Sequence, residues 1–115
     1  MIILTLVVFN KEQINEVVNK VLKNKWALNV FVGHAVDSYS MAEATVQNNS
    51  GVHLIQFATK SLLFTEIETT LQKEFPVMDF NIYAAPAVHV DTLYYERIKN
   101  GIPGLALLGK ELLNP

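Results

Sequence analysis

The stretch from residue 28 to residue 59 most constrains how this chain can fold. Two runs rich in β-branched and aromatic residues flank a polar segment, and the first run alternates in period two from Leu28 onward. The segment 48–51, NNSG, is a turn signal because Asn and Gly tolerate positive φ. The pattern predicts a long antiparallel hairpin with its turn at 48–51. Its outer half is expected to pack on another subunit, a ligand or a folded-back loop.

The residues before the hairpin predict a strand and then a helix. Ile2 to Phe9 reads as a continuous apolar run, which is typical of a buried strand. Asn10 is a good N-cap, and Gln13 stands where a capping box requires it. The following residues place an apolar stripe at helical spacing, so a helix is expected over residues 11–24.

The residues after the hairpin predict a helix, a strand and a third, short helix. Thr59 or Ser61 can cap a helix that Pro76 ends, because the residue before a proline disfavours the α region. Residues 80–86 alternate as a strand does. Asp91 or Thr92 then caps a helix over 93–100, which Gly101 closes. The tail to residue 115 is leucine-rich and forms either a last helix or an extended segment.

The resulting order, β-α-β-β-α-β, predicts an α+β fold of the ferredoxin-like class. In this fold a four-stranded antiparallel sheet carries two helices on one face, and here a short C-terminal helix is added. We expect the ferredoxin-like domain to span residues 1–100 and an extension to span 101–115. Because the first strand is read as apolar throughout, the bare sheet face should be apolar and covered by another copy of the chain.

Composition limits the possible functions. The 115 residues form one domain, and the chain has no Cys, so a disulfide framework and a Cys-zinc site are excluded. Its net charge is −2 and its single Arg is Arg97, so neither a nucleic-acid partner nor a membrane partner is expected. The apolar start lacks the features of a signal peptide, and a cytoplasmic location is predicted. A content of 50% hydrophobic and 17% charged residues favours self-association.

Several segments have counterparts in a known protein family: WALNV at 26–30, an aromatic at Tyr39, residues 59–76, IYAAP at 82–86 and LYYERI at 93–98. Together these segments resemble the CutA divalent-cation-tolerance family and, more widely, the PII-like superfamily. The resemblance implies a homotrimer whose sheets pack together around a three-fold axis. It also implies a non-enzymatic, regulatory protein that senses a small ligand or ion, or contacts a partner protein, at clefts between subunits.

The chain departs from that family at the residues that would carry its ligands. Leu28 stands near the position of the family's second-strand Cys, and only Pro76 remains of its His-Pro-Tyr-Glu motif. The resemblance therefore does not imply a copper site. PII proteins use basic residues near the hairpin for nucleotide, whereas no Lys or Arg occurs between Trp26 and Thr59. No cofactor is identified.

Two sets of candidate site residues remain. Three histidines could ligate a metal, and the alternative is that they are unrelated half-buried residues. A polar-aromatic set could bind a small ligand between subunits, and the alternative is that these hairpin side chains are simply exposed to solvent or hydrogen-bonded at a subunit interface. The metal candidates are His34, His53 and His89; the ligand candidates are Asp37, Tyr39, Glu43 and Tyr83.

No catalytic motif is present: the sequence has no P-loop, nucleophile elbow or Ser-His-Asp order. The first hypothesis is the non-enzymatic protein that the resemblance implies. One alternative is a cofactor-free monooxygenase or isomerase of the dimeric ferredoxin-like barrel type. Another is a structural subunit whose only property is self-association. The mass of the assembly separates a trimer from a dimer.

Overall fold

The computed structural model describes residues 1–75 and 80–103. Short 3-10 turns, Lys11–Gln13 and Ser61–Leu63, lead into the first two α-helices. The main elements, in chain order, are β1 (Ile2–Val8), α1 (Ile14–Lys23), β2 (Phe31–Ala42), β3 (Thr45–Thr59), α2 (Phe64–Glu74), β4 (Phe80–Pro86) and α3 (Thr92–Gly101). Among these residues, no helix is long and apolar enough to cross a membrane.

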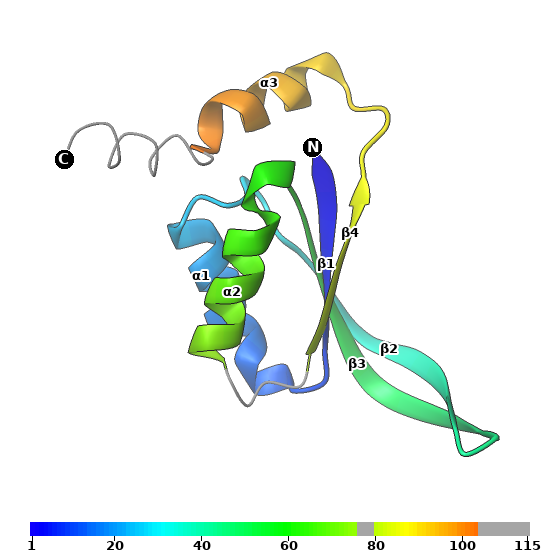
Figure 1. Ribbon diagram of the computed structural model, residues 1–115. Coiled ribbons are helices and arrows are strands. Elements are labelled where there is room, and N and C mark those ends of the chain that lie inside the picture. The colour runs from blue at the N-terminus through cyan, green and yellow to red at the C-terminus, as the bar shows by residue number, and fades with distance from the viewer. Residues whose placement is uncertain (76–79, 104–115) are drawn as a thin grey trace.

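The four strands form one antiparallel sheet in the order β2-β3-β1-β4. Helices α1 and α2 lie side by side on one face of this sheet, and none of the described helices covers the other face (Figure 1). The predicted ferredoxin-like fold is therefore confirmed. The hairpin of β2 and β3 extends well beyond the ends of β1 and β4, so the molecule measures 54 × 34 × 25 Å.

The core lies between the sheet and the two helices. Leu4, Leu6 and Val8 of β1 are fully buried, because side chains two residues apart on a strand point to the same face. Helix α1 meets them with its apolar stripe, including Val17 and Val21, and α2 does so with Ile67 and Leu71; these helical side chains are also fully buried. Burial of these residues is the main stabilising term.

The side-chain caps predicted at Asn10 and Asp91 are confirmed, although Asn10 caps the 3-10 turn Lys11–Gln13 and α1 itself begins at Ile14. Asn10 accepts a hydrogen bond from the Glu12 amide at 3.0 Å, and Asp91 accepts one from the Tyr94 amide at 2.9 Å. The predicted capping box is wrong, because the Gln13 side-chain oxygen is buried without a hydrogen-bond partner.

The predicted role of Gly101 is also wrong. This glycine is the last residue of α3 and does not have positive φ. A Cβ at this position would lie 2.8 Å from Cδ2 of Leu28, so the glycine makes room for the side chain that precedes β2. The expected effect of Pro76 and the conformation of the tail beyond Pro103 lie outside the described residues.

Neither residue predicted to cap the second helix does so. The N-cap position of the Ser61–Leu63 turn is Lys60, and no side chain caps it. The Thr59 hydroxyl is completely buried and donates instead to the Trp26 carbonyl oxygen at 2.6 Å. This hydrogen bond joins the segment after α1 to the end of β3.

The predicted position of the hairpin turn is wrong as well. The chain reverses at Glu43 and Ala44, whose φ values of 51° and 64° are those of a type I′ two-residue turn. Residues 48–51 lie within β3, where the φ of Gly51 is 88°. Cross-strand pairing and sheet twist favour this longer hairpin over the local preference of Asn and Gly, although it places two non-glycine residues at positive φ.

The uncovered sheet face is less uniformly apolar than β1 alone suggested. Thr5 lies on this face, and its hydroxyl accepts a hydrogen bond from the Gln56 amide at 3.1 Å. Ile3, Val7 and Leu54 surround this pair on the same face, as the strand register requires. The face is therefore mainly apolar, but it also carries the hydrogen-bonded Thr5–Gln56 pair and the exposed Asn81 of β4, which pairs with Val7.

Candidate functional site

A pair of histidines lies at an irregularity between β2 and β3. Gly33 pairs with Leu54, but the next pair is Val36 with Val52. Two residues of β2 therefore face one residue of β3, which is a β-bulge. A second irregularity follows at Asp37, and beyond it the original register returns.

The bulge leaves His34 beside His53. Their Nδ1 atoms are 3.3 Å apart, and the rings meet edge to face with centroids 5.3 Å apart and planes at 74°. His53 is buried, with 7% of its surface exposed, whereas His34 faces solvent. Two of the three predicted metal candidates are thus brought together on neighbouring strands.

The structure does not bring His89 to this pair. His89 follows β4 beyond Pro86, which pairs with Ile2 at one end of β1. His53 pairs with Val8 at the other end of β1. Within residues 1–75 and 80–103, no group of three metal-ligating side chains occurs.

Three of the four predicted ligand-binding residues lie along the outer hairpin. Asp37 is at the second irregularity, Tyr39 pairs with Asn48, and Glu43 is in the turn. All three are exposed, and 67% of Tyr39 is accessible. Tyr39 shares its hairpin face with Met41 and Val46, which are 67% and 65% exposed, so this face is as apolar as it is polar.

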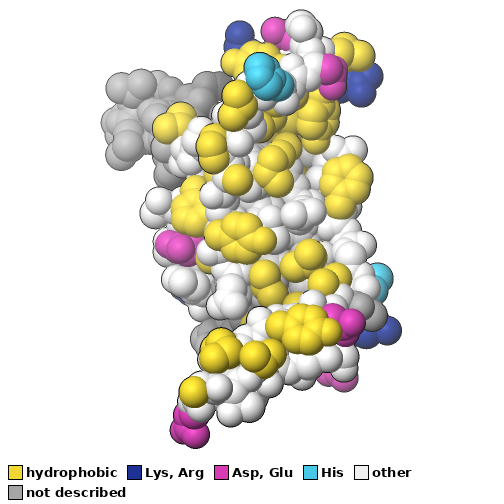
Figure 2. Space-filling view, turned by 90° about the vertical axis from the view of Figure 1, so that its right-hand side faces the viewer, with side chains coloured by type: hydrophobic (Ala, Val, Ile, Leu, Met, Phe, Trp, Pro, Cys, Tyr) yellow, Lys and Arg dark blue, Asp and Glu magenta, His cyan; other side chains and the backbone are white. Residues whose placement is uncertain are grey.

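Tyr83, the fourth candidate, is separated from the other three within one chain. It lies on β4, at the sheet edge opposite β2, and pairs with Thr5. Its side chain is 53% exposed on the uncovered face. Figure 2 shows this face, where hydrophobic groups are spread over the sheet and onto the hairpin. A site that contains all four candidates would require a second copy of the chain.

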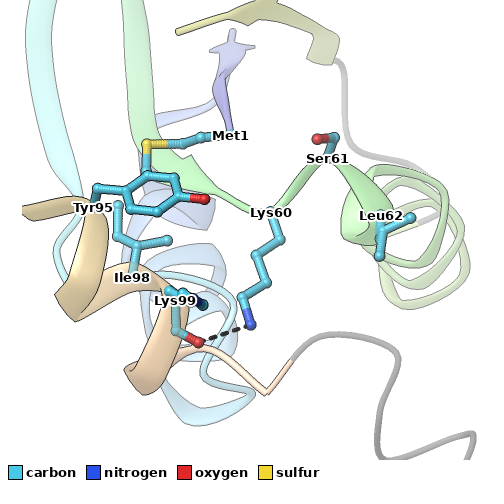
Figure 3. Close-up of a pocket in the computed structure, with 7 residues that line it drawn as sticks. All are labelled: Met1, Lys60, Ser61, Leu62, Tyr95, Ile98 and Lys99. Carbon is cyan, nitrogen blue, oxygen red and sulfur yellow. Dashed lines mark hydrogen bonds between the residues drawn. The ribbon is translucent and has the colours of Figure 1, made fainter. Parts of the chain in front are cut away.

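A pocket of about 220 Å³ lies between the start of β1, the start of the second helix and α3 (Figure 3). The Lys60 side chain crosses it and donates from Nζ to the Lys99 carbonyl oxygen at 3.0 Å. Tyr95 and Ile98 of α3 and Met1 supply apolar surface. Sequence reasoning missed this pocket, because its residues come from three distant segments and share no motif.

Comparison with known proteins supports the fold. No family model and no curated protein matches the sequence. Among solved structures, the chain is similar to CutA1 from the psychrotrophic bacterium Shewanella sp. SIB1, with a TM-score of 0.74 and 16% identity over 90% of this chain and 95% of that one.

Two further structures give the same result. The divalent cation tolerance protein CutA1 from Thermus thermophilus has a TM-score of 0.73 and 16% identity over 88% of this chain and 98% of that one. CutA1 from Oryza sativa has a TM-score of 0.70 and 21% identity over 87% and 91% of the two chains. The resemblance that the sequence indicated is thus confirmed in the fold, and the chain has the ferredoxin-like architecture of the CutA1 proteins.

Proposed function

We propose that this chain is a non-enzymatic, CutA/PII-like protein that assembles as a homotrimer and responds to a small ligand or ion at the clefts between subunits. The observation that carries the proposal is the uncovered apolar face of the sheet. The CutA1 neighbours support it through their fold, and several of them are described as divalent cation tolerance proteins. The cytoplasmic location stays a prediction from the sequence.

The uncovered face is well suited to packing against another sheet. Phe31 and Tyr83 lie in the same cross-strand row and are 64% and 53% exposed. Gln56 and Thr5 lie between them and bond to each other, so each side chain keeps one hydrogen bond when this row is buried. The Tyr83 hydroxyl can find a partner at the rim, as interface tyrosines usually do. Large exposed apolar surfaces of this kind mark interaction sites.

The projecting hairpin supports an assembly in which one copy reaches onto the next. Tyr39, Met41 and Val46 share one face of the hairpin, and about two thirds of each side chain is exposed in the single chain. Burial of such side chains stabilises an interface by about 25 cal/mol per Å² of apolar surface. In a trimer, Asp37, Tyr39 and Glu43 of one copy would face a neighbour and line the proposed cleft with Tyr83.

The mass of the particle in solution tests the assembly. Light scattering after size exclusion should give about three times the 12.9 kDa mass of the chain. Phe31→Glu should yield smaller particles, because a buried carboxylate without a partner is costly. Leu22→Glu is the matched control, since Leu22 lies on α1, is 41% exposed and is away from the uncovered face.

A stable dimer would contradict the trimer and favour the alternative, an enzyme of the dimeric ferredoxin-like barrel type. A wild-type monomer would contradict self-association altogether. If the particle is a trimer, calorimetric titration with copper, zinc and adenine nucleotides tests the sensing function. The ligand proposal predicts that Tyr39→Ala weakens the binding of at least one ligand that gives heat, and equal affinity for every such ligand would exclude Tyr39 from the cleft site.

A further inference from the structure

We propose that His34 and His53 form a two-imidazole site for a late first-row divalent metal ion such as Zn²⁺. The site lies within one chain, at the bulge between β2 and β3, so the inference does not depend on the proposed trimer. Imidazole nitrogen is a common ligand for Zn²⁺, Ni²⁺ and Cu²⁺. The remaining coordination positions would be taken by water, because the His34 side faces solvent.

The distance between the two nitrogens fits a shared metal. Zinc binds imidazole nitrogen at about 2.0–2.1 Å, so two nitrogens at a tetrahedral angle lie about 3.3 Å apart. The Nδ1 atoms of His34 and His53 are 3.3 Å apart. This spacing is also slightly longer than the usual N–H hydrogen bond of about 2.9–3.0 Å.

The ring positions agree with the same geometry. If the metal lies on the line from each ring centre through Nδ1, tetrahedral ligation places the two centres about 5.3 Å apart. The centroids are 5.3 Å apart, and the rings are inclined at 74°. Rings whose nitrogens pointed straight at each other would be farther apart, so the two rings are tilted away from the line that joins their Nδ1 atoms.

The backbone holds this pair in place. His34 follows the Gly33–Leu54 pair directly, and His53 is anchored in the sheet by its pairing with Val8 of β1. The extra residue of the bulge comes after His34, so the two histidines remain opposite each other. Burial of His53 restricts its rotamers, which lowers the entropy lost when a metal binds.

The local charge also favours a cation. No Lys or Arg occurs between Trp26 and Thr59, so β2 and β3 carry no positive side chain of these types. Asp37 lies three residues after His34 on the same strand. Its negative charge adds a favourable, salt-screened attraction for a divalent ion.

Zinc titration of the full chain by isothermal calorimetry tests the proposal. The wild type should bind one Zn²⁺ per chain. His34→Ala should weaken binding by about ten-fold or more, because the loss of one of two linked ligands removes the chelate effect. His34 is exposed, so this variant keeps the core intact. His89→Ala is the matched control and should bind zinc as the wild type does.

A second readout separates ligation from a structural effect. Zinc should raise the thermal midpoint of the wild type and of His89→Ala, but not that of His34→Ala or His53→Ala. Absence of zinc binding by a folded wild type would show that the pair is only an imidazole–imidazole hydrogen bond and would overturn the proposal. Equal affinity of the wild type and His34→Ala would overturn it as well. Particle mass, measured separately, keeps this result distinct from the trimer test.

Discussion

The hydrogen bond from Thr59 to Trp26 allows a sharp test of how the base of the hairpin is held. The Thr59 hydroxyl has no exposed surface, and it donates to the Trp26 carbonyl at 2.6 Å. Thr59→Val keeps the shape of the side chain but removes the donor. The carbonyl oxygen then stays buried without this partner, which costs about 1–3 kcal/mol. The variant should therefore lose about that amount of unfolding free energy.

Urea denaturation followed by fluorescence measures this loss directly. Trp26 is the single tryptophan of the chain and is only 4% exposed, so its emission reports the region of the bond. All variants are compared at one protein concentration, because self-association contributes to apparent stability. The denaturant midpoint should fall without a change in the slope of the transition.

Two further variants separate the bridging function of Thr59 from a capping function. Thr59→Ser keeps the hydroxyl and should recover most of the stability, since only a methyl group is lost. Ser61→Ala removes an exposed hydroxyl near the helix start and should change stability by less than about 0.5 kcal/mol. If Thr59→Val unfolds at the wild-type midpoint, or if Thr59→Ser is as unstable as Thr59→Val, the reasoning is refuted.

Two more predictions concern the ends of helices. Lys25 follows α1 and has a φ of 55°, and the Trp26 amide donates to the Val21 carbonyl oxygen, as in a Schellman motif. Because glycine adopts this positive φ without strain, Lys25→Gly should raise the free energy of unfolding by about 1 kcal/mol in chemical denaturation. Lys23→Gly, at the last residue of α1, should instead lower the stability, because glycine is a poor helix former, and equal effects of the two variants would contradict the argument. Asp91→Ala should lower the free energy of unfolding by about 1 kcal/mol and speed amide hydrogen exchange in α3, because the cap is lost. Asp91→Asn keeps an acceptor oxygen and should do neither. Unchanged amide exchange in Asp91→Ala would show that the cap is not needed.

Much of the fold was predictable because it depends on periodicity and on short-range chemistry. The helical spacing of Val17 and Val21, and the alternation around Leu4 and Leu6, each require one buried face. Caps such as Asp91 act within three residues, so they can also be recognised locally. The ferredoxin-like order follows once these elements are placed in sequence.

Two of the errors arose where a partner distant in the sequence overrode local preference. Residues 48–51 have the composition of a turn, but they pair as part of β3, and the chain turns at Glu43 and Ala44 instead. Thr59 has the composition of a helix cap, yet a partner 33 residues away takes its hydroxyl. In both places a long-range partner determines the structure, and no window of sequence contains that partner.

In the candidate site, too, the sequence determined some features and the tertiary structure determined others. The sequence by itself showed that the chain has three histidines and no cysteine, and that the hairpin has no Lys or Arg. It also determined the order of elements, because burial of one face imposes its period on the chain. Only the tertiary structure decided that His34 meets His53 and that His89 lies at the other end of β1. Register decides this, because a slip of one residue turns a strand's side chains to the opposite face, and here two compensating irregularities set which residues meet.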